Sequence, residues 1–170
     1  MNLVRAGIAL GSNLGDRLSH LRSAINALRD IAIPLEPFLQ APIYQTEPLL
    51  CPPGSPDFLN TVVEFGYRGS ALDLLAAARD IETRLGRNRS GLQNEPRVID
   101  VDLLYLGDLV HDDPDLQLPH PRIGERRFVL QPLAQIRPEL RLPGHERTVS
   151  ELLDGLSSDE APLVVLSEAD

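Results

Sequence analysis

Residues 98–106 read VIDVDLLYL, an apolar run with two acids inside it. Its β-branched and aromatic residues predict a strand, and Gly107 is a natural stop. Residues two apart on a strand point to one face of a sheet, so Asp100 and Asp102 would project together. Two neighbouring carboxylates repel each other unless a cation lies between them, and oxygen ligands of this kind suit Mg²⁺. The pair is a candidate metal site; a solvated face whose acids happen to alternate is the alternative.

Strand and helix patterns alternate upstream of this segment. Apolar, β-rich runs predict strands at residues 4–10, 38–44 and 58–67. Apolar residues at steps of three and four predict amphipathic helices at residues 18–28 and 71–85. With the strand described above as the last element, the order is β-α-β-β-α-β. This order predicts an α+β fold of the ferredoxin-like sandwich type.

The C-terminal part of the chain predicts helical additions to this fold. A short helix is expected around residues 126–135, and a last helix after the capping-box pattern Thr148-x-x-Glu151. We expect residues 1–156 to form a single domain. Residues 157–170 are expected to form an acidic tail, whose apolar LVVL stretch has no predicted role.

The composition of the 170 residues excludes several classes of protein. No apolar run reaches the length of a bilayer span, and we expect the opening residues to form a strand and not a signal peptide. The net charge of −9 argues against nucleic acid as a partner. A single cysteine, Cys51, leaves no intramolecular disulfide and favours the cytoplasm. The chain has no lysine, which excludes a Walker A phosphate loop and Schiff-base chemistry.

Arginines gather just before the carboxylate pair. Arg87 and Arg89 lie in a predicted loop, and Arg97 stands three residues before Asp100. Carboxylates that hold a metal, beside guanidinium groups, suit phosphoryl transfer, because that reaction needs charge neutralisation and positioning. The alternative is an arginine-rich loop that is simply solvated.

Two further positions could bind a ligand. Phe58 and Asn60 share one face of their predicted strand, and a ring beside an amide could hold a flat heterocycle. Core packing is the alternative for Phe58. His120 is fixed between two prolines and is available to a ligand, although a lone histidine is more often structural.

Six segments together resemble one known family, the 6-hydroxymethyl-7,8-dihydropterin pyrophosphokinases. The resemblance runs from about residue 6 to residue 156. The matching segments are LGSNLGDR (10–17), YQTEPLLCPPGSPDFLN (44–60), IETRLGRNR (81–89), PRVIDVDLL (96–104), LPHPRIGERRFVLQPL (118–133) and IRPEL (136–140). Many members carry Trp-Gly where this chain has Asn94-Glu95, so we expect an active enzyme with altered behaviour of that loop.

The resemblance implies a fold that binds ATP and the pterin side by side. It implies transfer of a diphosphate from ATP to the pterin hydroxymethyl group in folate biosynthesis, with AMP released. Two Mg²⁺ ions would be held by Asp100 and Asp102, and Arg87 and Arg97 would be catalytic. The ATP-binding residues would be Glu82, Arg87, Arg97, His120 and Arg126. The pterin-binding residues would be Thr46, Glu47, Pro48, Leu49, Phe58, Asn60 and Phe128.

Two other classes of protein stay open at this point. A nucleotidyltransferase also uses paired strand carboxylates and ATP, but its usual Gly-Ser followed by Asp-x-Asp is half present, with Leu18 after Asp16. A non-catalytic ferredoxin-like binding module would require the carboxylates and arginines to be incidental. The products formed from ATP and a hydroxymethylpterin distinguish the three: free AMP, attached AMP, or no turnover.

Overall fold

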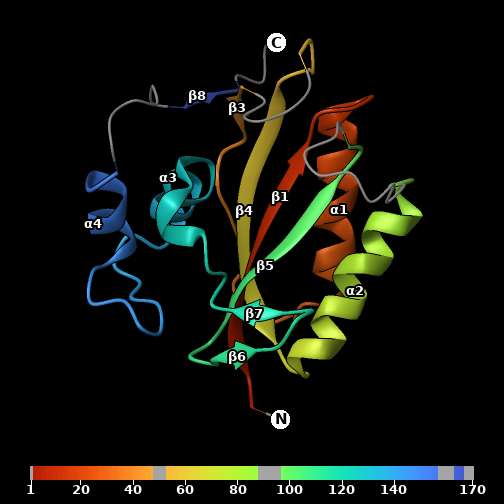
Figure 1. Ribbon diagram of the computed structural model, residues 1–170. Coiled ribbons are helices and arrows are strands. Elements are labelled where there is room, and N and C mark those ends of the chain that lie inside the picture. The colour runs from red at the N-terminus through yellow and green to blue at the C-terminus, as the bar shows by residue number, and fades with distance from the viewer. Residues whose placement is uncertain (1, 48–52, 88–96, 157–162, 167–170) are drawn as a thin grey trace.

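The computed structural model describes residues 2–47, 53–87, 97–156 and 163–166 of the chain. A six-stranded sheet runs through its centre in the order β5-β1-β4-β3-β8, with β2 also paired to β4 (Figure 1). Its strands are β1 (Val4–Ser12), β2 (Leu39–Gln40), β3 (Tyr44–Thr46), β4 (Phe58–Tyr67), β5 (Asp100–Leu106) and β8 (Val164–Val165). All the strand pairs in this sheet are antiparallel.

Helices cover both faces of the sheet. Two pack on one face and two on the other (Figure 1). The first pair is α1 (Arg17–Ile31) and α2 (Ala71–Arg84), and the second is α3 (Arg127–Ile136) and α4 (Val149–Asp154). The element order and the strand order confirm the predicted ferredoxin-like sandwich with C-terminal helical additions.

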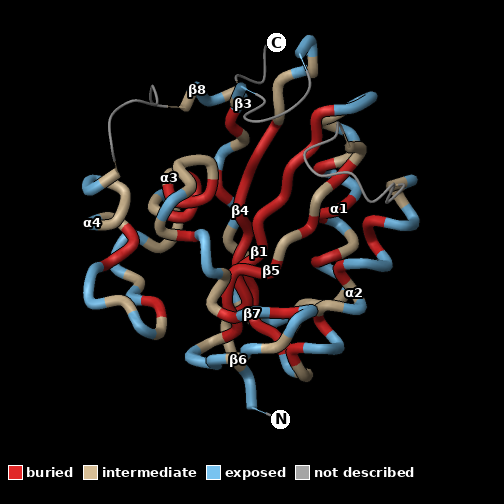
Figure 2. The backbone as a smooth tube through the Cα atoms, in the orientation of Figure 1, coloured by how far each residue is buried: buried red, intermediate tan, exposed pale blue. Residues whose placement is uncertain are grey.

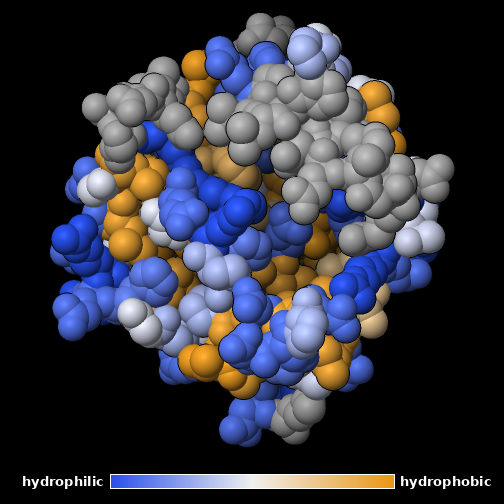
Figure 3. Space-filling model, viewed as in Figure 1, coloured by the Kyte–Doolittle hydropathy of each residue, from blue (hydrophilic) through white to orange (hydrophobic). Residues whose placement is uncertain are grey.

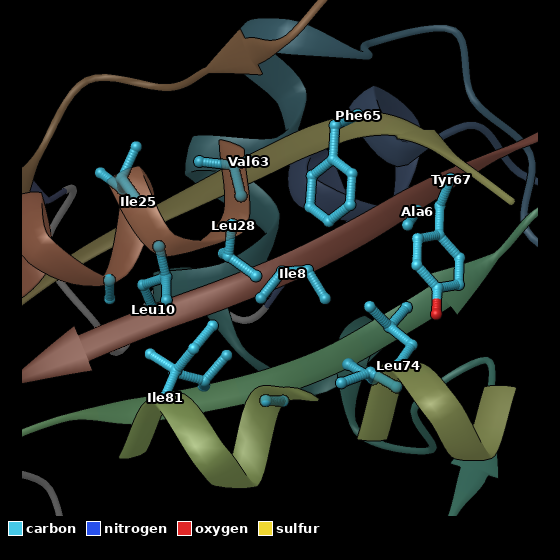
Figure 4. Packing of buried hydrophobic residues seen from close by; sticks show 14 of the residues in the cluster. Ala6, Ile8, Leu10, Ile25, Leu28, Val63, Phe65, Tyr67, Leu74 and Ile81 are labelled. Carbon is cyan, nitrogen blue, oxygen red and sulfur yellow. The ribbon is translucent and has the colours of Figure 1, made fainter. Parts of the chain in front are cut away.

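A separate apolar core lies on each side of the sheet, and the central strands are buried almost throughout (Figure 2). On the first side, Ile8 of β1 packs with Leu28 of α1 and Leu74 of α2 (Figure 4). On the second side, Val62 of β4 packs with Leu130 of α3. Because alternate residues of a strand enter different cores, the face of each strand residue is fixed by its register.

Both α2 and α4 begin with a side-chain cap, and the cap of α4 is the one that the sequence predicts. The Ser70 hydroxyl accepts the N–H of Asp73 at the beginning of α2. At α4 the Thr148 side chain and Glu151 form a complete capping box. Such caps satisfy N–H groups that have no partner inside the helix.

A buried carboxylate ties α3 to the sheet. Glu64 of β4 has no exposed side-chain surface, and its oxygens lie 2.9 Å from Nε of Arg5 and 2.6 Å from Nη1 of Arg137. Glu64 also accepts a hydrogen bond from the hydroxyl group of Tyr105. Arg137 directly follows the last residue of α3, so this network fixes the C-terminal end of that helix. Phe128 lies at its N-terminal end.

Three features of the fold differ from the sequence-based prediction or extend it. The single strand predicted at residues 38–44 is two short strands, β2 and β3, because Pro42 between them has no N–H to donate. The β6–β7 hairpin (His111–Asp112 and Gln117–Leu118) was not predicted. The LVVL stretch of the tail supplies β8, which pairs with β3.

Within the described residues, no helix combines the length and the apolar character that crossing a membrane would require.

Candidate active site

The predicted metal pair and two of the predicted pterin residues, Phe58 and Asn60, lie on one face of the sheet, on either side of β1. Gly11 of β1 is the register partner of Asn60 on β4 and of Asp100 on β5. Ala9 pairs in the same way with Val62 and Asp102. Neighbouring strands lie about 4.8 Å apart, so Asn60 and Asp100 project from backbones separated by about 10 Å.

Small residues keep the floor between the two groups open. A Cβ atom on Gly11 would lie 2.7 Å from Oδ1 of Asn60 and 3.6 Å from Cδ1 of Phe58. Glycine at this position therefore lets the Asn60 side chain lie across β1. In the space-filling view, hydrophilic residues surround a hollow with apolar residues in its floor (Figure 3).

The two aspartates of β5 face away from α1 and α2. Val101 and Leu103, which alternate with them, are buried in the core on the α1–α2 side, as the sequence predicts. The guanidinium of Arg87 contacts both Glu82 and Asp100, and Nε of Arg97 lies 2.6 Å from Oδ2 of Asp100. The structure thus brings both predicted catalytic arginines to the carboxylate pair.

Burial and the repulsion between the aspartates weaken the acidity of Asp100. Burial is the largest cause of the rise, the charges of Asp102 and Glu82 add to it, and Arg97 and Arg87 oppose it; together they place the pKa of Asp100 at about 6. A bound cation would stabilise the ionised form of Asp100 against the cost of burial. Carboxylate oxygens are ligands that Mg²⁺ prefers. The donor set therefore fits the metal implied by the sequence.

A cavity of about 290 Å³ lies beside the carboxylate pair, between α2, β5 and the β6–β7 hairpin. Glu82, Asp102 and His120 line it, and Leu75 and Leu116 add apolar walls. Apolar walls with a few polar groups are typical of a site for a small organic ligand. The cavity thus brings together two predicted ATP-binding residues, Glu82 and His120, and one predicted metal ligand, Asp102.

His120 is held in one orientation at the edge of this cavity. Its backbone N–H donates to the carbonyl of Leu104 at 2.7 Å, and its Nδ1 accepts the N–H of Arg122 at 3.1 Å. Burial lowers the pKa of His120, with the nearby Arg126 and Arg122 acting in the same direction and Asp102 against it. The neutral ring therefore carries its proton on Nε2, which remains available as a donor.

Three of the predicted pterin residues, Thr46, Phe58 and Asn60, lie together where β3 pairs with the beginning of β4. The amide of Asn60, 7 % exposed, donates to the hydroxyl of Thr46 at 2.6 Å. Phe58 is half-buried, lies outside both apolar cores, and has the guanidinium of Arg97 5.4 Å from its ring centre. The structure therefore does not favour the alternative for Phe58, that it packs in a core.

The remaining predicted pterin residues differ in their setting. Phe128 is partly buried against the second core, with Arg126 5.5 Å from its ring centre, so it has both a packing and a surface role. Burial lowers the pKa of Arg126. Glu47 is exposed beside Thr46. Pro48 and Leu49 lie outside the described residues, as do Arg89 and the Asn94-Glu95 pair.

Sequence reasoning missed two groups of residues around the site. Asp115 and Gln117 of the hairpin and Arg79 of α2 line the cavity, but they carry no periodic pattern that marks them. Asn13 contacts both Pro56 and Arg97. The polar pair Ser12-Asn13 at the end of a buried strand is the signal that could have indicated Asn13, because buried polar groups need hydrogen-bond partners.

Comparisons with known proteins identify the family to which the chain belongs. The sequence model of the 7,8-dihydro-6-hydroxymethylpterin-pyrophosphokinase (HPPK) family matches residues 7–138, and the chain belongs to this family. The 2-amino-4-hydroxy-6-hydroxymethyldihydropteridine pyrophosphokinase of Pseudomonas aeruginosa is 39% identical over 151 residues, which are 88% of this chain and 90% of that protein. The predicted family is thereby confirmed.

Other relatives are longer proteins. The folic acid synthesis protein fol1 of Schizosaccharomyces pombe is 35% identical over 90% of this chain, and a folate synthesis bifunctional protein of Chlamydia caviae is 38% identical over 82%. The chain spans 20% and 32% of their lengths. The crystal structure of wild-type Plasmodium falciparum HPPK-DHPS with pteroate has a TM-score of 0.65 at 14% identity, covering 90% of this chain and 42% of that one. That likeness supports the fold.

Proposed function

We propose that the chain transfers a diphosphate from ATP to the hydroxymethyl group of 6-hydroxymethyl-7,8-dihydropterin. The products would be AMP and the pterin diphosphate, a step of folate biosynthesis. The observation that supports this most strongly is the register across β1, where Gly11 separates Asn60 from Asp100. One side of β1 carries an amide and an aromatic ring, and the other carries paired carboxylates with arginines.

On the nucleotide side, Asp100 and Asp102 would hold two Mg²⁺ ions, which neutralise phosphate charge when they are bound. Arg87 and Arg97 already lie at this carboxylate pair, within reach of a triphosphate placed there. His120 and Arg126 lie close enough to the pair for the charge of Asp102 to act on the pKa of both. The adjoining cavity would take the base and ribose, between the side chains of Leu75 and Leu116.

On the pterin side, Phe58 and Phe128 would stack on the two ring faces. Asn60 would read the polar edge of the ring, since an amide can both donate and accept. Its hydrogen bond to Thr46 fixes the orientation of this amide before the ligand arrives. A ring held in this slot would direct its hydroxymethyl group across the glycine floor toward the carboxylates.

The chemical step would be a displacement at phosphorus. The pterin hydroxyl oxygen would attack the β-phosphorus of ATP, and the bond to the oxygen shared with the α-phosphate would break. AMP would leave with that oxygen, and the hydroxyl proton would pass to water. The side chains contribute positioning and charge stabilisation, from Arg87 and Arg97 above all, because no strong base is required.

This use of ATP, together with the single cysteine, is consistent with work in the cytoplasm, where we propose that the protein acts.

Product analysis tests the proposal. The protein is incubated with ATP, Mg²⁺ and the reduced hydroxymethylpterin, and products are identified by mass. We expect free AMP and a pterin that has gained a diphosphate. A pterin that carries AMP would instead indicate a nucleotidyltransferase, and binding without turnover a binding module. Asp102→Asn should be inactive, whereas Asp80→Asn, on the exposed face of α2, should behave as wild type.

A further inference from the structure

We infer that Asn13 is a positioning residue that couples pterin binding to nucleotide binding; naming these two ligands rests on the proposed function. Asn13 directly follows β1 and is 1 % exposed. Its side chain joins two segments that are distant in sequence. One leads into the pterin strand at Phe58, and the other leads into the metal strand at Asp100.

Three hydrogen bonds make this junction. The backbone N–H of Asn13 donates to the carbonyl of Arg97 at 3.1 Å, and the Oδ1 atom accepts the N–H of Arg97 at 2.7 Å. The Nδ2 atom donates to the carbonyl of Pro56 at 3.3 Å. Asn13 therefore binds both the N–H and the carbonyl of Arg97, and its side-chain amide also binds the segment that leads to Phe58.

Each end of the junction leads to residues that are proposed to contact a ligand. Arg97 extends to Asp100, and its guanidinium also lies over the ring of Phe58. Pro56 stands two residues before Phe58, and the next carbonyl, that of Asp57, accepts a hydrogen bond from Arg17 at 2.9 Å. A ligand that orders either segment therefore acts on the hydrogen bonds of Asn13.

The planarity of the amide makes the two ends interdependent. Oδ1 and Nδ2 turn together about one bond, so an orientation that improves the contact with Pro56 also sets the contact with Arg97. A buried amide that loses one partner has no water to replace it, and both contacts are favoured together. Pterin bound at one end should thus favour the arginine position that binds nucleotide, and by linkage the reverse holds equally.

Two variants separate the parts of the junction. Asn13→Asp keeps the acceptor for Arg97 but places an oxygen against the carbonyl of Pro56, so it breaks the pterin side selectively. Asn13→Ala removes both side-chain bonds. Asn26→Asp introduces the same chemical change on the exposed surface of α1 and serves as the matched control.

The measured quantity is the coupling factor. The dissociation constant of the reduced pterin is determined with and without a saturating non-hydrolysable ATP analogue and Mg²⁺, and the nucleotide constant with and without pterin. Wild type and Asn26→Asp should show a ratio of about fivefold or more, the lower end for coupled sites. The ratio should fall toward one in Asn13→Ala and in Asn13→Asp, and Asn13→Asp should keep its affinity for nucleotide alone.

Three outcomes would overturn the inference. They are an unchanged ratio in folded Asn13→Ala, a ratio of one in wild type, and equal weakening of both ligands with the ratio preserved, which is what a purely structural role predicts. If wild type bound both ligands and turned them over, these outcomes would leave the proposed function standing. If wild type bound neither ligand, both proposals would fail.

Hydrogen exchange on the wild-type protein avoids dependence on the folding of the variants. The amide of Arg97 donates to Asn13, so pterin alone should slow its exchange. An Arg97 amide whose exchange pterin leaves unchanged would contradict the coupling, whatever the stability of the Asn13 variants.

Discussion

Arg97 lies against Asp100, with 2.6 Å between the Nε and Oδ2 atoms. The same arginine is proposed to bind the phosphates of ATP, so in the ligand-free protein it neutralises a carboxylate that is later shared with metal. Arg87 is placed alike, between Glu82 and Asp100. Binding of ATP with its metal therefore requires an exchange of partners at Asp100.

Because of this exchange, Arg97→Ala should change the affinity for a divalent cation alone and the affinity for the metal–ATP complex in opposite directions. Loss of a positive charge beside Asp100 should strengthen binding of a divalent cation alone by several-fold, because like charges repel at short range. The same change should weaken binding of the metal–ATP complex, because a phosphate partner is lost. Titration with Mn²⁺ and with Mn²⁺–ATP analogue measures both. Arg84→Ala, at an exposed arginine of α2, is the control, and a change of equal sign in both titrations would contradict the exchange.

The raised pKa of Asp100 predicts how stability varies with pH in the metal-free protein. Its pKa is about 6 in the folded state, against about 3.9 for an unfolded aspartate, so the folded state binds this proton more tightly. Its contribution to stability is present below pH 4 and is lost as the pH rises through 6. Asp100→Asn lacks this loss, so it should be more stable than wild type at pH 8 by on the order of 1–3 kcal/mol, with a smaller gain near pH 4.

Denaturant unfolding at both pH values without Mg²⁺ measures this difference. The control is Asp80→Asn, which makes the same chemical change at an exposed carboxylate of α2. The opposite result, a wild type more stable than Asp100→Asn at pH 8, would contradict this prediction. It would show that the contacts of Asp100 with Arg87 and Arg97 stabilise the fold by more than the burial of its charge costs.

The pterin slot gives a prediction that separates site from core. Phe58→Ala and Phe128→Ala should each weaken pterin binding by about 1–3 kcal/mol, the range for aromatic stacking on a base. Asn60→Ala should lose a comparable amount, since polar atoms of the ring would stay buried without partners. Nucleotide binding without pterin should barely change. Isothermal titration and melting temperature, on the same three variants, supply the comparison.

Core residues would give a different pattern. Truncation of a buried phenylalanine costs about 3–5 kcal/mol of folding stability, and both ligands would then weaken together. Because Phe128 packs against the second core and Phe58 does not, we expect the larger stability loss from Phe128→Ala.

The glycine floor is tested by Gly11→Ala. The added Cβ would lie 2.7 Å from Oδ1 of Asn60, so that side chain must leave its place beside Thr46. Pterin affinity should fall about as far as in Asn60→Ala, while nucleotide affinity is kept. At Gly124 a Cβ would lie 3.8 Å from Cε1 of His145, an ordinary contact distance, so Gly124→Ala is the control. Unchanged pterin binding in Gly11→Ala would remove Asn60 from the site.

Much of the fold could be predicted from local patterns. The strand at residues 58–67 has the predicted bounds, and both amphipathic helices lie where their apolar periodicity places them. The alternation of Asp100 and Asp102 with buried residues was equally local, because a strand has a two-residue repeat.

What the sequence could not predict depends on contacts between distant segments. The tail becomes a strand only because β3 offers it an open edge, and nothing within LVVL indicates that partner. The pairing of Asp100 with Arg87 joins residues thirteen positions apart, which lie on different elements of the fold. The junction at Asn13 spans 84 positions to Arg97, and no local pattern encodes such a distance.

The origin of each transferred phosphorus is the most direct test of diphosphate transfer at this site. The protein is given the reduced hydroxymethylpterin, Mg²⁺ and ATP labelled in turn at the α, β or γ phosphorus. The account predicts that the β and γ labels appear in the pterin product and that the α label stays in free AMP. An α label in the pterin product would contradict it, and so would transfer of the γ label without the β label.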